Sequence, residues 1–137
     1  MSAKPQILAI DDESSIRLLL KNFLSNNYDV TLKNDALEAL EWLEGKKPPD
    51  LIICDVQMGG KDDEERKGGK AFVKKLREQG FNKHTPVVML SGVESSMERV
   101  ECYRCGAQDF LKKPFNPEEL DEIIKKNLFP VHYAKKW

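Results

Sequence analysis

Short apolar runs alternate along the chain with longer stretches in which apolar residues recur every three or four positions. An uninterrupted apolar run of about five residues is typical of a strand that is buried on both faces of a parallel sheet. The runs predict five strands, of which the second alternates only weakly, at residues 6–10, 28–32, 51–54, 87–90 and 109–112.

The stretches between these runs have the spacing of amphipathic helices. Their apolar stripes are Ile16, Leu19, Leu20, Phe23 and Leu24, then Leu37, Leu40 and Leu43, then Phe72, Val73 and Leu76 within 71–79, and finally Leu120, Ile123, Ile124 and Leu128. A further helix is predicted over residues 95–105. Each run is thus followed by one helix.

Start and stop signals flank several of these helices. Asparagine and aspartate are preferred caps at helix starts, proline suits the first helical position, and glycine is common just past helix ends. The start signals are Asn34–Asp35 and Asn116 with Pro117 and Glu119, and the stop signals are Gly45 and Gly106. These signals support the helix boundaries that the apolar spacing predicts.

Strands that alternate with helices predict right-handed crossovers and a parallel sheet with helices on both faces. At 137 residues the chain suits one such domain. We expect a doubly wound five-stranded α/β domain over residues 1–129, followed by a tail or the start of a linker to an output domain at 130–137. Ligands bind such sheets beyond the carboxyl ends of the strands.

Polar side chains follow four of the five predicted strands. They are Asp11 and Asp12 after the first strand, Asp55 after the third, Ser91 after the fourth and Lys112–Lys113 at the end of the fifth. The carboxyl ends of parallel strands meet at one edge of the sheet, so we expect these side chains to lie close together.

This combination of side chains predicts phosphoryl chemistry. Three carboxylates at one edge repel one another unless a cation lies among them, and Mg²⁺ prefers such oxygen ligands. A lysine ammonium and a serine hydroxyl can bind phosphate oxygens, while an aspartate carboxylate can itself accept a phosphoryl group. The residues therefore predict phosphorylation of Asp55, with Mg²⁺ as the cofactor.

Four motifs in this order resemble the receiver domain of two-component response regulators. They are ILAIDDE, LIICDVQM, VVMLSG and FLKKPF, and the resemblance covers about residues 6–128. It implies a flavodoxin-like sheet with the strand order 2-1-3-4-5. It also implies that Asp55 takes a phosphoryl group from a sensor histidine kinase or a histidine phosphotransfer protein.

The resemblance assigns roles to further residues. Asp12 would bind Mg²⁺ directly, Asp11 would do so through water, and the backbone carbonyl of Gln57 would be another ligand, beside Asp55 itself. The family's dimers imply a homodimer through the fourth helix, fifth strand and fifth helix, which the sequence does not decide.

Three more positions match the family's functional residues. Ser91 and Lys113 would hold the phosphoryl oxygens, and Lys113 rather than Lys112 matches because it directly precedes Pro114. Phe110 falls at an aromatic switch position, although an aromatic residue on a strand also suits the core. Gln57 and Val93 would influence how long the phosphoryl group lasts.

The segment at residues 59–69 departs from the family pattern, because it is several residues longer and strongly charged. One hypothesis is that it tunes access of kinase, phosphatase or water to Asp55. The alternative is a mobile, solvated insertion without a role. Replacing residues 61–67 with a short turn would separate the two.

Composition and charge bear on the partners and the cellular location of the protein. The formal net charge is −1, which gives no reason to expect nucleic-acid binding, and no apolar stretch has the length of a membrane span. Three cysteines do not indicate a disulfide framework. We expect a cytoplasmic protein. The C-x-x-C at Cys102 and Cys105 lies within a predicted helix, so it is interpreted as ordinary helix cysteines rather than a redox or zinc site.

Two other classes of function remain open at this point. A receiver-like interaction module could act without phosphorylation, although the complete set of functional residues argues against it. A phosphatase with an aspartate nucleophile, of the haloacid dehalogenase type, would need D-x-D after the first strand, where this chain has Asp11, Asp12 and Glu13. The expected protein is therefore a regulatory domain and not an enzyme.

Overall fold

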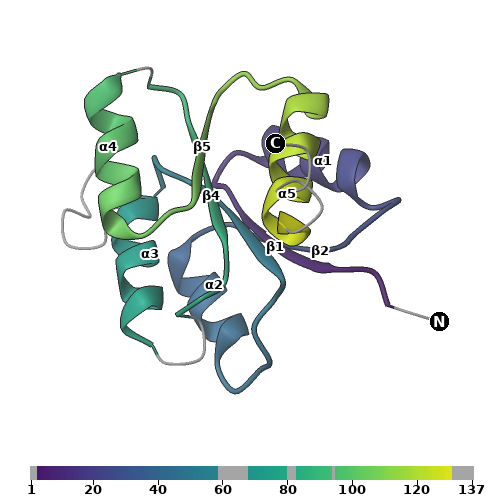
Figure 1. The fold of residues 1–137 in the computed structure, drawn as a ribbon. Helices are drawn as coiled ribbons and strands as arrows, with labels where there is room; N and C mark the ends of the chain where they lie inside the picture. The colour runs from purple at the N-terminus through teal and green to yellow at the C-terminus, as the bar shows by residue number, and fades with distance from the viewer. Residues whose placement is uncertain (1–2, 59–67, 80–82, 94, 131–137) are drawn as a thin grey trace.

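The structure, a computed structural model, describes residues 3–58, 68–79, 83–93 and 95–130. This part of the chain forms one parallel sheet of order β2-β1-β3-β4-β5 with five helices (Figure 1). The strands are β1 (Gln6–Ile10), β2 (Asp29–Lys33), β3 (Leu51–Asp55), β4 (Val87–Ser91) and β5 (Asp109–Lys112). The helices are α1 (Ser14–Leu24), α2 (Ala36–Leu43), α3 (Gly68–Glu78), α4 (Ser96–Cys105) and α5 (Pro117–Leu128). The expected doubly wound α/β fold and strand order are confirmed.

Two apolar clusters lie on opposite faces of the sheet. One joins the sheet to α1 and α5 through residues such as Leu20, Leu24 and Leu120, and the other joins it to α2, α3 and α4 (Figure 1). Every residue of β3 and β4 is buried, which explains their uninterrupted apolar sequence. None of the helices described has the length and apolarity needed to cross a membrane.

The predicted caps are present at two helix starts. The Asp35 side chain accepts a hydrogen bond from the Glu38 backbone N–H at 2.9 Å, and the Glu38 side chain accepts one in return from the Asn34 N–H at 2.9 Å. At α5, the Asn116 side chain accepts from the Glu118 N–H at 2.8 Å. Both starts therefore follow from local chemistry.

Two leucines that were expected in apolar stripes are exposed. Leu19 of α1 is 41% exposed and Leu37 of α2 is 53% exposed. With 3.6 residues per turn, Leu19 lies about 100° around the helix from the buried Leu20, and Leu37 lies about 160° from the buried Ala39. The buried residues of α2 are Ala39 and Leu43, of which the spacing of the leucines had indicated only Leu43.

Several element boundaries also differ from the prediction. The second strand is shifted by one residue to 29–33, and β3 and β4 each extend one residue further than the apolar run. Asp55 and Ser91 are therefore the last paired residues of their strands rather than the first residues of loops. Helix α3 begins at Gly68, three residues before the predicted start, so the end of the 59–69 segment is helical.

Candidate functional site at the carboxyl end of the sheet

The polar residues predicted to meet at one edge of the sheet do meet there. Asp11, Asp55 and Ser91 are all buried, although each carries a polar side chain. Asp55 is paired with Leu90, and Ser91 is paired with Lys112, so the carboxyl ends of β3, β4 and β5 are aligned at the same edge of the sheet. The backbone N–H of Lys113 donates to the Ser91 carbonyl at 2.7 Å, which carries this alignment one residue further.

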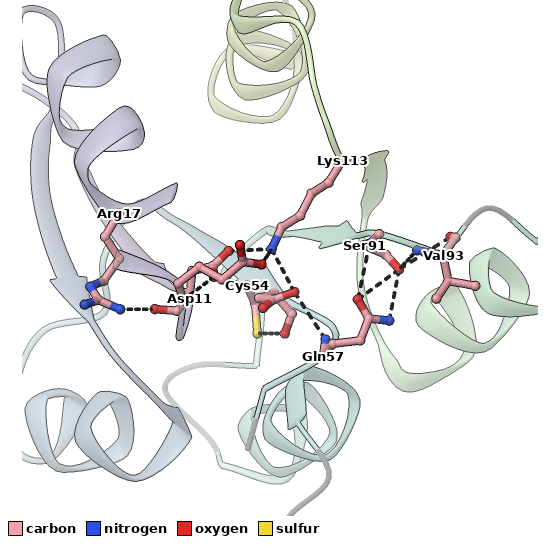
Figure 2. Close-up of polar contacts among 10 residues, drawn as sticks. Asp11, Arg17, Cys54, Gln57, Ser91, Val93 and Lys113 are labelled. Carbon is pink, nitrogen blue, oxygen red and sulfur yellow. Dashed lines mark hydrogen bonds and ion pairs between the residues drawn. The ribbon is translucent and has the colours of Figure 1, made fainter. Parts of the chain in front are cut away.

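Lys113 is the cation of the site. Its Nζ lies 2.8 Å from Oδ2 of Asp11 and 3.2 Å from Oδ1 of Asp55, with Oε1 of the exposed Glu13 at 3.4 Å (Figure 2). The Lys113 side chain is only 12% exposed. Burial alone would lower the pKa of Lys113, but the two aspartates outweigh it and the pKa is raised. The ammonium group therefore stays charged between two buried carboxylates.

Asp11 is held from several directions. Its Oδ1 accepts a hydrogen bond from the Glu13 N–H at 2.9 Å, and Nη1 of Arg17 donates to its backbone carbonyl at 2.8 Å (Figure 2). Its own N–H donates to the Lys33 carbonyl at 3.2 Å, beyond the end of β1. These contacts fix the turn between β1 and α1. Neither Arg17 nor Glu13 was given a role at this site from the sequence, where only their closeness to Asp11 could have indicated one.

The environment of Asp55 disfavours its charged form. Burial, and then the charge of Asp11, raise its pKa from 3.8 to about 7, although Lys113 and the backbone N–H of Gln57 act in the opposite direction. That N–H donates to Oδ1 of Asp55 at 3.2 Å. Asp55 is thus a carboxylate placed where a further positive charge would favour its ionised form.

Four acidic side chains converge at this edge. Asp11, Asp12, Glu13 and Asp55 each offer a carboxylate oxygen, and these atoms lie within 4.8 Å of one another. Asp12 and Glu13 are exposed, so the group opens to solvent on one side. A purely oxygen donor set with high negative charge fits a hard divalent cation. The expectation of direct binding by Asp12, and of binding through water by Asp11, stays a prediction, as does the ligand role of the Gln57 carbonyl.

Ser91, the last residue of β4, is fully engaged in hydrogen bonds. Its Oγ accepts from the Val93 N–H at 3.0 Å and from Nε2 of Gln57 at 3.1 Å (Figure 2). The sequence had suggested a backbone carbonyl ligand at Gln57 and an influence of Gln57 on the phosphoryl lifetime, but not the hydrogen bond of its side chain to Ser91.

Phe110 on β5 is buried and belongs to the apolar cluster beneath α4. The guanidinium carbon of Arg99 on α4 lies 5.0 Å from the centre of its ring, a cation–π arrangement. The core interpretation of Phe110 is therefore supported, while its switch role stays a prediction.

Two glycines join α3 to the end of β3. A Cβ atom on Gly69 would overlap with the backbone oxygen of Asp55 and lie 2.8 Å from Cε of the buried Met89. A Cβ on Gly68 would overlap with the oxygen of Val56, and Gly68 has a φ of +57°. Only glycine permits this close approach, because it lacks a Cβ and accepts positive φ. The Gly68–Gly69 pair therefore sets where Asp55 lies relative to α3.

The two cysteines of the C-x-x-C motif are not part of any group of possible metal ligands among the described residues. Cys102 and Cys105 are free thiols within α4, and burial raises the pKa of Cys102 to about 12 and also raises that of Cys105. Such thiols are poor nucleophiles, which supports their interpretation as ordinary helix cysteines. Residues 59–67 lie outside the described residues, so the access hypothesis for the 59–69 segment stays a prediction.

Lys113→Met is expected to destabilise the folded protein by about 3 kcal/mol at pH 8, because it leaves two buried carboxylates without their counter-charge. The loss should be smaller at pH 6, where Asp55, with a pKa of about 7, carries its proton in the wild type and in the variant alike. Urea unfolding followed by circular dichroism measures both values. Lys74→Met, at an exposed residue of α3, is the matched control. Equal losses at the two pH values would contradict the ion-pair assignment.

Comparisons with known proteins give one consistent result. The family model described as response regulator receiver domain matches residues 7–125. The response regulator Rre1 of Synechocystis is 34% identical over 91% of this chain and 52% of its own length, and the alkaline phosphatase synthesis regulator PhoP of Bacillus subtilis is 36% identical over 88% and 47%. The chain therefore spans about half the length of these relatives. The crystal structure of the chemotaxis protein CheY4 of Vibrio cholerae has a TM-score of 0.81 and 35% identity, over 92% of this chain and 100% of that one.

Proposed function

The chain belongs to the family of response regulator receiver domains, and from this premise we propose that Asp55 accepts a phosphoryl group from a phosphohistidine. The donor would be a sensor histidine kinase or a histidine phosphotransfer protein. The observation that carries the proposal is the buried Asp55 carboxylate, in contact with Lys113 and within an acidic group that is open on one side. Such a rim combines a nucleophile, a fixed cation and space for a second one.

The transfer needs little covalent chemistry from the protein beyond the nucleophile. An oxygen of Asp55 forms a bond to phosphorus as the phosphorus–nitrogen bond of the donor breaks, and the imidazole leaves with the electron pair and takes up a proton. Lys113, 3.2 Å from Oδ1 of Asp55, would bind the phosphoryl oxygens that arrive beside it. Ser91 would donate to another of these oxygens. The product is an acyl phosphate on Asp55.

The acidic group fits Mg²⁺, which Asp12, Asp55 and the carbonyl of Gln57 would bind directly and Asp11 through water. When bound, Mg²⁺ offsets the negative charge of these carboxylates and of the phosphoryl oxygens. The raised pKa of Asp55 supports this assignment. A carboxyl group with a pKa of about 7 is only partly ionised near neutral pH, and a cation bound beside it would favour its ionised form.

The output of the switch would involve α4, β5 and α5. The exposed face of α4 carries Met97 (61% exposed), Val100 (39%) and Tyr103 (42%), and Arg99 of the same helix covers Phe110. A change at Asp55 that alters the position of Phe110 would thus reach a surface suited to a partner or to a second copy of the chain. Binding to nucleic acid or membrane is no part of this proposal.

The proposal describes a regulatory domain, which assists only its own phosphorylation and dephosphorylation. The domain would comprise residues 1–129, and residues 130–137 would be a tail or the start of a linker. With a cytoplasmic kinase as its partner, the domain would act in the cytoplasm.

Incubation with acetyl phosphate tests the proposal. We expect the intact mass to increase by one phosphoryl group per chain when Mg²⁺ is present and not when it is removed by chelation. Fragment masses should place the group on the peptide that contains Asp55. A folded protein that gains no mass would favour a phosphate-independent interaction module. Sustained release of phosphate from a simple monoester would favour a phosphatase instead.

A further inference from the structure

The side chain of Gln57 bridges from the end of β3 to the loop after β4. Its oxygen, Oε1, accepts a hydrogen bond from the Gly92 N–H at 3.2 Å, and its nitrogen, Nε2, donates to Oγ of Ser91 at 3.1 Å. Figure 2 shows Gln57 turned toward Ser91 rather than toward Asp11. One carboxamide thus engages Ser91, which was predicted to hold a phosphoryl oxygen, and the neighbouring N–H of Gly92.

The orientation of this carboxamide follows from its partners. A backbone N–H can only donate, so the group that faces Gly92 must be the oxygen, and the NH₂ group is then directed to Ser91. Oγ of Ser91 also accepts from the Val93 N–H, and its hydrogen can be donated to Oε1 of Gln57 at 3.3 Å or to the Val93 carbonyl at 3.4 Å. The hydroxyl of Ser91 is therefore fully occupied within the protein.

The same two donors lie next to the reactive residue. The Val56 N–H donates to the Leu90 carbonyl at 2.8 Å, and Asp55 is paired with Leu90, so Ser91 and Gly92 directly follow the strand position beside Asp55. A phosphoryl group on Asp55 carries anionic oxygens, which accept hydrogen bonds more strongly than a neutral carboxamide oxygen does. These oxygens would need the donors that Gln57 occupies.

We propose that Gln57 is a positioning residue that holds Ser91 and Gly92 in a resting arrangement and competes with the incoming phosphoryl group for these two donors. The inference rests on the proposed phosphorylation of Asp55. It concerns how readily the group enters, which is a different quantity from how long it stays. Entry requires the carboxamide to leave, and its hydrogen bonds resist this.

Gln57→Met removes the carboxamide while keeping the length of the side chain. In the resting protein the Gly92 amide should exchange its hydrogen about fivefold faster than in the wild type, as expected for the loss of one neutral hydrogen bond. Phosphoryl incorporation from acetyl phosphate and Mg²⁺ should start about fivefold faster. Amide exchange by NMR and intact mass over time give these two readouts. Gln6→Met, at an exposed residue at the opposite end of the sheet, should change neither.

A Ser91→Ala background separates this role from a general effect on the fold. Without the hydroxyl, the acceleration by Gln57→Met should be smaller than in the wild-type background, because the contact with Ser91 is gone and only the contact with the Gly92 N–H is left to compete. An equal acceleration in both backgrounds would overturn the assignment to Ser91. Unchanged Gly92 exchange, or an unchanged or slower rate in Gln57→Met while the wild type is phosphorylated normally, would overturn the inference and leave the proposed function standing. A wild type that takes up no phosphoryl group would overturn both.

Discussion

Replacing Asp55 with asparagine is expected to abolish phosphoryl incorporation and, at the same time, to stabilise the resting protein at pH 8. Asparagine has nearly the same shape but no nucleophilic carboxylate, so no acyl phosphate can form. The stabilisation follows from the position of Asp55, which is 1% exposed and lies near the charge of Asp11. An uncharged amide removes that repulsion.

The pH dependence of this stabilisation follows from the pKa of Asp55. The pKa is 3.8 in the unfolded chain and about 7 in the folded protein, so the folded state retains the proton more strongly. The ionisable carboxyl therefore costs nothing below about pH 4, costs increasingly more between pH 4 and 7, and costs a constant amount above pH 7. We expect Asp55→Asn to be more stable than the wild type by about 2 kcal/mol at pH 8 and by about 1 kcal/mol at pH 5. Both values are about half the free energy of the full pKa shift, because the site is open to water on one side, which screens the charges.

Two measurements check this prediction. Intact mass after incubation with acetyl phosphate reports phosphorylation, and urea unfolding at pH 5 and pH 8 without Mg²⁺ reports stability. Asp29→Asn, at an exposed residue at the start of β2, is the matched control and should change neither. Full phosphorylation of Asp55→Asn would show that another residue is the nucleophile. A variant that is less stable than the wild type at pH 8 would contradict the account of the charges.

Gly69→Ala is expected to destabilise the folded protein by about 3 kcal/mol, which is typical of an added methyl group with no room in a rigid core. The new Cβ would overlap with the backbone oxygen of Asp55 and lie 2.8 Å from Cε of Met89. Met89 is fully buried, and the Asp55 backbone is held within β3 by its pairing to β4. The tip of the Met89 side chain can move aside, but the Asp55 backbone cannot move without disturbing the sheet, so α3 must shift away from the site.

This shift should also slow phosphorylation, because Asp55 must lie correctly against Lys113 and the donor for in-line transfer. Thermal unfolding and the initial rate of phosphoryl incorporation, measured on the folded fraction, test the two effects. Gly92→Ala is the control for the stability effect, since nothing lies within 4 Å of the Cβ that it would add and its backbone N–H is kept. Equal midpoints of thermal unfolding for Gly69→Ala and Gly92→Ala would contradict the close packing of α3 against the end of β3.

Together, the two substitutions separate stability from function at one edge of the sheet. The carboxylate of Asp55 lowers the stability of the resting protein, whereas the glycine pair allows the packing that holds this carboxylate in place. Sites that perform chemistry commonly retain residues that reduce stability, because a substitution that stabilises the fold would remove the reactive group. Asp55 fits this description, with Lys113 partly offsetting the cost.

Particular residues show where sequence reasoning was sufficient. Caps at Asp35 and Asn116 were predictable because a helix start is satisfied by side chains a few residues away. Leu19 and Leu37 were misplaced because apolar spacing does not reveal which side of a helix the sheet will cover. The start of α3 at Gly68 was missed because it depends on contact with the end of β3. The helix propensity of the residues around Gly68 does not reflect such a contact.

The sequence alone determined the fold class, the strand order through its resemblance to a family, and the gathering of Asp11, Asp12, Asp55, Ser91 and Lys113 at one edge. It could do so because apolar periodicity and the geometry of parallel crossovers act along the chain. Only the tertiary structure decided that Lys113 lies between Asp11 and Asp55, and that the Gln57 carboxamide engages Ser91 and Gly92. These contacts depend on distances of a few ångströms between side chains from different strands, and such distances are set by packing across the whole domain.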